Sequence, residues 1–326
     1  MKLIIQIPCH NEEETLAMTL ADLPRSLPGI TVVEWLVVDD GSTDGTAEVA
    51  RAHGVDHVVR LPRHQGLARA FMAGLEASLK AGADIIVNTD ADNQYCAEDI
   101  PKLIQPILDG KAELVIGARP IKDIEHFSFV KKQLEKLGSW AVRLASKANI
   151  PDAPSGFRAI SRSAAMRLNV FHEYTYTLEM IIQAGQKGMA ITSVPIRVNE
   201  DLRPSRLVKS VPSYVLHSVL TIIRIAITYR PFRFFAVQGA VSLMLGFLLG
   251  LRFLCYYFTG GGRGHVQSVI LSALFISVGF FLLIAGVLAD LIAVNRKMLE
   301  ELKWRMWNLE ISKKSESEKE PSDFSL

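Results

Sequence analysis

Along the first two-thirds of the chain, short apolar runs alternate with segments whose apolar residues recur every three or four positions. The runs have the length of strands, and the segments between them have the periodicity of helices. The strand-like runs are KLIIQIP, EWLVVDD, HVVRL, DIIVNTD and ELVIGAR, and the helical segments are Glu12–Leu23, Thr43–His53, Gly66–Ala81 and Glu98–Leu108. This alternation predicts an α/β domain with a mostly parallel sheet and helices on both faces.

After the run ELVIGAR the alternation is less regular. We expect helices over residues 129–148 and 176–186, with a strand in AITSVPIRV. The segment 211–229 is apolar but is interrupted by His217 and Arg224, which is typical of an amphipathic helix at a membrane surface. The pattern leaves a core helix of the soluble domain open as an alternative.

Two later runs, Phe234–Leu251 and Ser268–Ala289, contain no charged residue. At about 1.5 Å per residue, each crosses most of a bilayer core about 30 Å thick. We therefore expect transmembrane helices over residues 233–258 and 267–294. Two buried helices of a soluble core are the less favoured interpretation, because the runs are long.

Positive charge gathers on the outer flanks of these two runs, whereas the link TGGGRGH between them holds one arginine. The flanking basic residues are Lys209, Arg224, Arg230, Arg233, Arg296, Lys297, Lys303 and Arg305. The first apolar stretch of the chain is short and meets Asn11–Glu14, so no signal peptide is expected. By the positive-inside rule, the soluble domain and both termini are predicted to be cytoplasmic, and the link to be outside.

These patterns divide the chain into a soluble domain (1–208), an interfacial helix (209–232), the two spans and a polar tail (295–326). The final stretch, SKKSESEKEPSDFSL, is poor in apolar residues, so we expect it to be disordered. The formal net charge is +2, and no basic stripe with interleaved aromatic residues is present in the soluble part, which argues against nucleic acid as a partner. The three cysteines form no Cys-x-x-Cys, so neither a disulfide framework nor a zinc site is expected.

In parallel sheets, ligands bind at the carboxyl ends of the strands, so the turns there are the places to look for chemistry. The first strand ends in IPCHNEEE, where Pro8 stops the strand and Asn11-Glu12 can cap the next helix. The second ends in VVDDGSTDGT. A helix cap does not require Asp39 and Asp40, whose carboxylates can accept hydrogen bonds from a base or a ribose. The spacing is not Gly-x-Gly-x-x-Gly, so a nicotinamide cofactor is not expected.

The fourth strand ends in DADNQ. Asp90 and Asp92 lie two residues apart in an extended segment, so both carboxylates can face one point. Such oxygen ligands suit a hard divalent cation, Mg²⁺ or Mn²⁺, with water and phosphate oxygens completing its shell. Gln94 can add a carbonyl ligand or a hydrogen bond. A polar loop that only caps the helix near Glu98 is the competing structural interpretation.

Taken together, the motifs IPCHNEEE, VVDDGSTDGT, RHQGLARA, DADNQ and IGAR resemble those of glycosyltransferase family 2. With the apolar C-terminal runs, the chain is similar to the polyprenyl-phosphate glycosyltransferases of the dolichyl-phosphate mannose synthase type, over about residues 1–207. The resemblance implies a GT-A, Rossmann-like catalytic domain. It also implies inverting, metal-dependent transfer of a sugar from a nucleotide-diphosphate sugar, UDP- or GDP-linked, to a membrane undecaprenyl or dolichyl phosphate.

The resemblance also assigns residues by position. It implies a nucleotide-sugar site of Pro8, His10, Glu12, Asp39, Asp40, Arg69, Asp90, Ala91 and Asp92, and metal ligation by Asp90, Asp92 and Gln94. It implies catalytic roles for Asp92, Asp152, Arg119, Lys131, Arg203 and Arg206, and an acceptor-side loop at Ser155-Gly156-Phe157. For Lys131 with Lys132, and for Arg203 with Arg206, a solvated charge run is the alternative. A phosphate acceptor is already mostly dianionic at neutral pH, so whether Asp152 is a base or orients a neighbour stays open.

Other functions compete with this one. A family 2 enzyme could act on another lipid or on a saccharide, but the four tryptophans lie outside the Gln/Arg-x-x-Arg-Trp motif of processive polysaccharide synthases. A nucleotidyltransferase would carry a Gly-rich basic loop where this chain has PCHNEEE. A non-catalytic, membrane-bound nucleotide-sugar-binding module would be expected to have lost the acidic cluster, which is intact. The sequence leaves the sugar, the isoprenoid and the oligomeric state, including a homo-oligomer, open.

Overall fold

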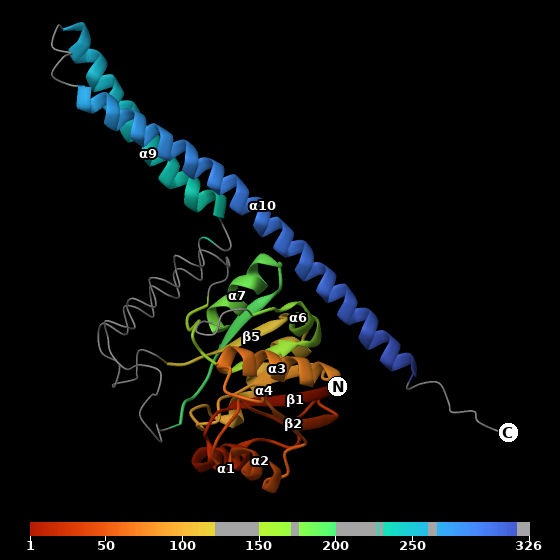
Figure 1. The fold of residues 1–326 in the computed structure, drawn as a ribbon. Coiled ribbons are helices and arrows are strands. Elements are labelled where there is room, and N and C mark those ends of the chain that lie inside the picture. The colour runs from red at the N-terminus through yellow and green to blue at the C-terminus, as the bar shows by residue number, and fades with distance from the viewer. Residues whose placement is uncertain (121–149, 171–175, 200–226, 228–230, 260–265, 318–326) are drawn as a thin grey trace. The chain divides into compact units, whose positions relative to one another are not determined.

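The computed structural model describes residues 1–120, 150–170, 176–199, 227, 231–259 and 266–317 (Figure 1). The chain forms two compact units, one of residues 1–221 with 303–326 and the other of residues 222–302. The helices expected over 129–148 and 211–229 lie wholly or almost wholly outside the described residues.

The first unit alternates strands and helices as the periodicity predicts. The strands are β1 (Lys2–Cys9), β2 (Val32–Asp39), β3 (His57–Arg60), β4 (Ile85–Asn88), β5 (Leu114–Ala118), β6 (Arg158–Ser161) and β7 (Ile191–Pro195). The helices are α1 (Glu13–Asp22), α2 (Thr46–Ala52), α3 (Leu67–Lys80), the 3-10 turn η1 (Ala97–Asp99), α4 (Ile100–Leu108), α6 (Arg162–Arg167) and α7 (Tyr176–Gln186). The second unit holds α9 (Pro231–Phe258) and part of α10 (Val266–Ser317).

The seven strands form one sheet in the order β3-β2-β1-β4-β6-β5-β7. Neighbouring strands run parallel except at β6, which is antiparallel to both β4 and β5. The prediction of a mostly parallel α/β sheet is therefore confirmed. The sequence did not identify β6, because it is a short run that begins with an arginine. Its pairing of Asn88 with Arg158 brings the start of β6 to the carboxyl end of β4.

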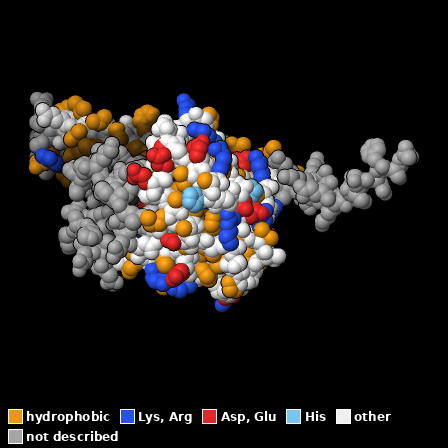
Figure 2. Space-filling view, turned by 90° about the horizontal axis from the view of Figure 1, so that it is seen from below, with side chains coloured by type: hydrophobic (Ala, Val, Ile, Leu, Met, Phe, Trp, Pro, Cys, Tyr) orange, Lys and Arg blue, Asp and Glu red, His pale blue; other side chains and the backbone are white. Residues whose placement is uncertain are grey.

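Both faces of the sheet are buried, and the alternating residues of β1 separate them. Leu3, Ile5 and Ile7 pack with residues of α1, α2 and α4 in one cluster. Ile4 packs with residues of α3, α6 and α7 in the other. Helices therefore cover both faces, as expected for a parallel sheet whose central strands are apolar throughout. On the face shown in Figure 2, acidic and basic side chains of the described residues are interspersed.

In the second unit, α9 and the first part of α10 pack closely through small residues. The Ser242 hydroxyl donates to the Phe275 carbonyl at 2.7 Å, and the Ser272 hydroxyl donates to the Gly246 carbonyl at 2.6 Å. Their outward faces are apolar, and only 17% of the most apolar window of each helix is buried. Both helices are long and apolar enough to cross a membrane, and they contain the predicted spans 233–258 and 267–294.

The helix α10 continues to Ser317, so it enters the segment that the composition predicts to be disordered. Residues 296–317 contain no glycine or proline, and Arg296 pairs with Glu300 one turn later, which favours a continued helix. The part of α10 from Lys303 belongs to the first unit. There Lys303 Nζ donates to Asn169 Oδ1 at 2.7 Å, and Trp307 packs against the cluster of α3, α6 and α7.

The segment after β7 runs beside the DADNQ loop and is fastened by a buried carboxylate. Tyr95 pairs with Val198, and the Asn199 backbone N–H donates to the Gln94 carbonyl at 2.9 Å. The fully buried Asp99 accepts hydrogen bonds from the backbone and guanidinium of Arg197 and, at 2.7 Å, from Lys102 Nζ. Although burial alone raises it, these bonds lower the pKa of Asp99 to about 2.

Replacement of Asp99 by asparagine is expected to destabilise the protein by about 2 kcal/mol at pH 7. The pKa of Asp99 in the folded state lies below the ordinary value of 3.8, so this stabilisation is complete above pH 4 and is lost as the pH falls towards 2. The difference between wild type and Asp99→Asn in unfolding experiments should shrink over that range. Asp109→Asn is the control, because Asp109 is exposed to solvent beside Lys111 and should change stability little. A difference that stays constant between pH 7 and pH 2.5 would contradict the assignment.

Candidate active site

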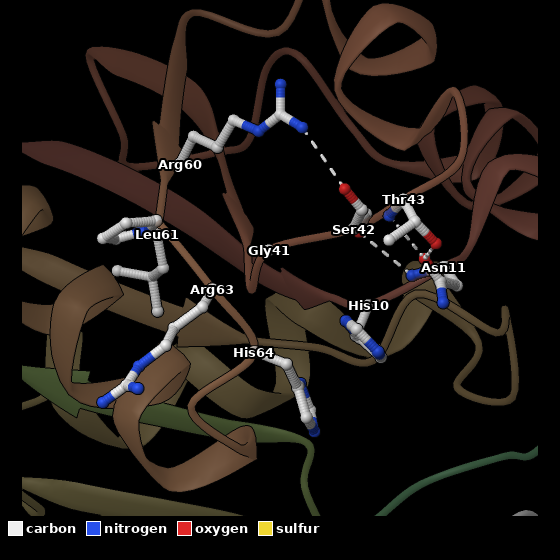
Figure 3. Close-up of a pocket in the computed structure, with 10 residues that line it drawn as sticks. His10, Asn11, Gly41, Ser42, Thr43, Arg60, Leu61, Arg63 and His64 are labelled. Carbon is white, nitrogen blue, oxygen red and sulfur yellow. Dashed lines mark hydrogen bonds between the residues drawn. The ribbon is translucent and has the colours of Figure 1, made fainter.

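An open pocket of about 790 Å³ lies where the loops after β1, β2 and β3 meet (Figure 3). Its lining residues are His10, Asn11, Gly41, Ser42, Thr43, Arg60, Leu61, Pro62, Arg63 and His64. The sequence predicted His10 here but not Arg60, which ends β3, nor Leu61–His64, which follow it. The only signal for those residues was the RHQG motif.

Asp40 fastens the loop that forms one wall of this pocket. One carboxylate oxygen accepts the backbone N–H of Gln65 at 2.8 Å, and the other accepts that of Gly66 at 2.8 Å and lies 2.9 Å from His64 Nδ1. The backbone carbonyl of Asp40 accepts a hydrogen bond from His10 Nδ1 at 2.9 Å. The rings of His10 and His64 stack with their centroids 3.9 Å apart. Asp40 therefore shapes the pocket through the backbone of the next loop.

Asp39 is fully buried and holds the turn after β2. It accepts the backbone N–H of Ser42 at 2.8 Å and pairs with Arg60 Nε at 3.2 Å. Arg60 also donates to the Ser42 carbonyl at 3.2 Å (Figure 3). Gly41 has a φ of 64°, and a Cβ there would lie 2.3 Å from the backbone of Arg63, so only glycine fits this crossing of two loops.

The remaining residues predicted for the nucleotide side have mainly structural contacts. Pro8 is paired within β1, opposite Val38. Glu12 precedes α1, where its carboxylate accepts the Thr15 hydroxyl at 2.9 Å, and its backbone N–H donates to the Thr46 hydroxyl at 2.9 Å. Arg69 is exposed in the first turn of α3. The hydrogen bond from Glu12 to Thr46 thus holds the loops after β1 and β2 together.

The loop after β4 carries Asp90 and Asp92, both half-buried. Asn93 has a φ of 54°, and the Gln94 backbone N–H donates to Asp92 Oδ1 at 3.2 Å, so the loop is a tight turn. Ala91 is buried, and its carbonyl accepts the Thr19 hydroxyl of α1 at 2.9 Å. The turn is fixed from both sides, by α1 and by its own aspartate.

Negative charge accumulates at this turn. Burial and the neighbouring carboxylate of Asp92 raise the pKa of Asp90 to about 7, against the opposing effects of Arg119, the Tyr95 hydroxyl and Arg158. The described residues contain no group of three or more His, Cys, Asp or Glu side chains placed to share a metal ion. Two carboxylates with an amide nearby fit a hard cation that takes most of its ligands from water and a diphosphate. The residues present therefore fit Mg²⁺ or Mn²⁺.

The loop Ser155-Gly156-Phe157 lies directly against Asp90. A Cβ on Gly156 would lie 2.9 Å from the Asp90 carboxylate. The Gly156 backbone N–H donates to the Tyr95 hydroxyl at 2.9 Å, and its carbonyl accepts Asn88 Nδ2 at 2.8 Å. Burial and the charge of Asp90 raise the pKa of Tyr95, so its hydroxyl stays protonated and donates to Asp90.

Arg119 and Asp152 form a two-pronged ion pair beside this loop. Arg119 Nε donates to one carboxylate oxygen at 2.7 Å and Nη2 to the other at 3.0 Å, and the backbone N–H of Arg119 adds a third bond at 3.1 Å. The Asp152 side chain is fully buried, whereas 12% of the Arg119 side chain is exposed. The carboxylate is therefore committed to orienting the guanidinium.

The structure thus gathers the predicted residues into two neighbouring groups. His10 lines the pocket, and Asp39 and Asp40 hold the loops that form it, whereas Pro8, Glu12 and Arg69 are not among its lining residues. The second group, at the ends of β4 and β5, consists of Asp90, Asp92, Gln94, Arg119 and Asp152. Lys131, Lys132, Arg203 and Arg206 lie outside the described residues.

Sequence reasoning missed four polar residues that support the acidic turn: Gln6, Asn88, Tyr95 and Arg158. Gln6 Nε2 donates to Asn88 Oδ1 at 2.9 Å in the middle of the sheet, and both side chains are fully buried. The available signal was a polar residue inside an apolar run, such as Gln6 in KLIIQIP and Asn88 in DIIVNTD.

Comparison with known proteins places this arrangement in a family. The undecaprenyl-phosphate mannosyltransferase of Micrococcus luteus is 31% identical over 218 residues, covering 64% of this chain and 88% of that protein. The UDP-N-acetylglucosamine–dolichyl-phosphate N-acetylglucosaminyltransferase of Methanococcus voltae is 31% identical over 216 residues, covering 59% of this chain and 83% of that protein.

Among solved structures, glucosyl-3-phosphoglycerate synthase from Mycobacterium tuberculosis, in complex with Mn²⁺, UDP and glucosyl-3-phosphoglycerate, matches with a TM-score of 0.54. It is 22% identical and covers 68% of this chain and 79% of that one, so it shares the fold. The family model described as "Glycosyl transferase family 2" matches residues 4–169, about half of the 326-residue chain. The chain therefore belongs to glycosyl transferase family 2.

Proposed function

We propose that this glycosyltransferase moves a sugar from a nucleotide-diphosphate sugar to a membrane polyprenyl phosphate, with inversion at the anomeric carbon. The observation that carries the proposal is the Asp90–Asp92 turn packed against the Gly156 loop, in a chain with two helices long and apolar enough to cross a membrane. Relatives with 31% identity whose names specify undecaprenyl and dolichyl phosphate acceptors support the acceptor class.

The pocket at His10 and His64 is the proposed nucleotide site, because it opens at the carboxyl ends of β1 and β2. The carboxylates of Asp39 and Asp40 are engaged with the protein, so they act by shaping this pocket. Arg60 and Arg63 border it and supply positively charged N–H donors for a nucleotide diphosphate.

Asp90 and Asp92 are proposed to hold the divalent cation, with Gln94 beside them. When bound, the cation neutralises the diphosphate as the bond to the sugar breaks. Burial and the neighbouring carboxylate of Asp92 raise the pKa of Asp90, and a bound cation would relieve the repulsion between the two carboxylates. A single displacement at the anomeric carbon needs no carboxylate nucleophile, in contrast with retaining hydrolysis.

The acceptor needs positioning more than deprotonation. A phosphate monoester has a second pKa near 6 and is mostly dianionic at neutral pH. Asp152 is committed to Arg119, so we propose that Asp152 orients the Arg119 guanidinium towards phosphate oxygens rather than acting as a base. Lys131, Arg203 and Arg206 keep the basic roles that the resemblance implies.

The proposed topology follows the distribution of basic residues. Arg230 precedes α9 and Arg233 lies in its first turn, and Arg296 and Lys297 follow the apolar part of α10. We therefore place the catalytic unit and both termini on the cytoplasmic side and residues 260–265 outside. In this orientation the acidic turn is on the same side as soluble nucleotide sugars.

The donor and acceptor classes are tested by incubating membranes that contain the full chain with labelled UDP- or GDP-linked sugars and a polyprenyl phosphate, followed by lipid extraction. The panel includes mannose, glucose, galactose and N-acetylglucosamine, because relatives of equal identity are named for different sugars. We expect label in the lipid phase with one donor, dependent on added polyprenyl phosphate. Label in water-soluble or polymeric material instead would overturn the acceptor assignment.

The cation model predicts that Asp92→Ala lowers transfer by at least about 10³-fold while nucleotide binding survives weakly, because diphosphate charge is no longer neutralised. Asp84→Asn is the matched control: Asp84 precedes β4 at its other end and accepts the Lys2 backbone N–H at 2.8 Å. Rates of lipid labelling with and without a chelator measure the effect. Unchanged transfer by Asp92→Ala in the presence of chelator would rule out the model.

The orienting role of Asp152 predicts that Asp152→Asn raises the KM for polyprenyl phosphate by about 10- to 100-fold and leaves the pH dependence of kcat unchanged. A general base typically contributes about 10² to 10⁴ in rate, and its loss would remove one limb of the pH profile. Steady-state kinetics at several pH values separate the two roles. Loss of that limb with an unchanged acceptor KM would assign Asp152 as the base.

A further inference from the structure

Arg158 is a charged side chain buried completely at the start of β6. Its Nε donates to the Ser155 carbonyl at 2.7 Å, Nη2 to the Ala153 carbonyl at 2.7 Å and Nη1 to the Thr177 carbonyl at 2.8 Å. In the part of the chain that the structure describes, it forms no ion pair with a carboxylate. A buried guanidinium whose hydrogen bonds all go to backbone carbonyls is costly to keep.

The three carbonyls show what this side chain achieves. Two of them belong to the loop before β6, and the third belongs to the first turn of α7. A planar fork of donors fixes the directions of all three carbonyls at once, which the single ammonium of a lysine cannot do. The guanidinium therefore fixes the backbone conformation of residues 153–156.

The conformation of this loop determines how closely Gly156 packs against Asp90. With the loop drawn inward, the Gly156 N–H reaches the Tyr95 hydroxyl and its carbonyl reaches Asn88. The Gly156 backbone then lies so close to the Asp90 carboxylate that a Cβ would sit 2.9 Å from one of its oxygens. Tyr95 in turn donates to Asp90, and its ring stacks on Phe157 with centroids 5.1 Å apart. Asp90 is thus confined on the side facing the loop.

Arg158 also contributes charge. Burial lowers the pKa of Arg158 to about 10, so the side chain remains positive at neutral pH. This charge acts on Asp90 and partly offsets the repulsion from Asp92. Geometry and charge both act on the carboxylate that the proposed function assigns to a divalent cation.

We propose that Arg158 is a positioning residue for the cation site, holding the Ala153–Gly156 loop against Asp90 so that its carboxylate faces the same point as that of Asp92. The inference rests on the proposed function for the presence of the cation. It adds a residue that touches neither cation nor substrate and acts through two backbone carbonyls.

The test measures Mn²⁺ affinity of the purified full chain in detergent, from the paramagnetic resonance signal of free Mn²⁺, with saturating UDP or GDP, whichever binds the wild type more tightly. Arg158→Lys keeps the charge and loses the fork, and Arg158→Met loses both. Supporting groups around a metal site typically change its affinity by about 10- to 100-fold, and we expect a loss in that range for both variants. At saturating Mn²⁺, the kcat of Arg158→Lys should lie closer to the wild-type kcat than its apparent Mn²⁺ affinity lies to the wild-type affinity.

Arg162→Lys is the matched control. Arg162 follows β6 at its other end and donates to the Ala83 carbonyl at 3.0 Å, so its replacement also removes an arginine-to-carbonyl bond. Its Mn²⁺ affinity should stay within about twofold of wild type. If the Arg158 variants do not fold, Gly156→Ala tests the same contact with Arg158 in place, and it should weaken Mn²⁺ binding similarly.

The outcomes separate this inference from the proposed function. Folded Arg158 variants, or Gly156→Ala if these do not fold, with Mn²⁺ affinity unchanged from wild type would overturn the positioning role. A wild type that binds no Mn²⁺ would overturn it together with the cation model. A wild type that binds Mn²⁺ but labels no lipid would count against the proposed acceptor only, while the shift in Mn²⁺ affinity would still decide the role of Arg158.

Discussion

The antiparallel strand β6 between β4 and β5 is the constraint on which the candidate site depends. Parallel strands deliver only their own carboxyl ends to the ligand edge of a sheet. The reversed strand delivers its amino end there instead, and with it the loop Ser155-Gly156-Phe157. The pairing of Asn88 with Arg158 fixes the register, so Gly156 meets Asp90 rather than a neighbour. A register slip of one residue would exchange the faces on which these side chains lie.

A connected set of polar groups crosses the middle of an otherwise apolar sheet and supports the contact between Gly156 and Asp90. It runs from Gln6 to Asn88, then through the Gly156 backbone to Tyr95 and Asp90. Buried polar groups are costly unless they are hydrogen-bonded, so each member depends on the next. Such a network specifies one arrangement of the loop and the acidic turn, which an apolar core could not do.

The sequence predicted the elements whose signals are local. The apolar runs and helical periodicity located β1 to β5 and α1 to α4 closely, because each element is buried on faces that its own pattern displays. The acidic turn was also predictable, since two carboxylates after a buried strand have few purely structural explanations. The order of strands and the reversal of β6 were not, because they depend on pairing between residues such as Val87 and Ala159 that are far apart in the chain.

The role of Asp40 could not be predicted from the local sequence either. Its hydrogen-bond partners lie about 25 positions further along, in the backbone of Gln65 and Gly66. That arrangement has a thermodynamic meaning for the pocket in Figure 3. A wall held by a buried carboxylate is already in place before a ligand arrives, so binding loses little conformational entropy there. For the proposed nucleotide site, discrimination among nucleotides would then rest on the fit to a preformed shape rather than on the ordering of a loop.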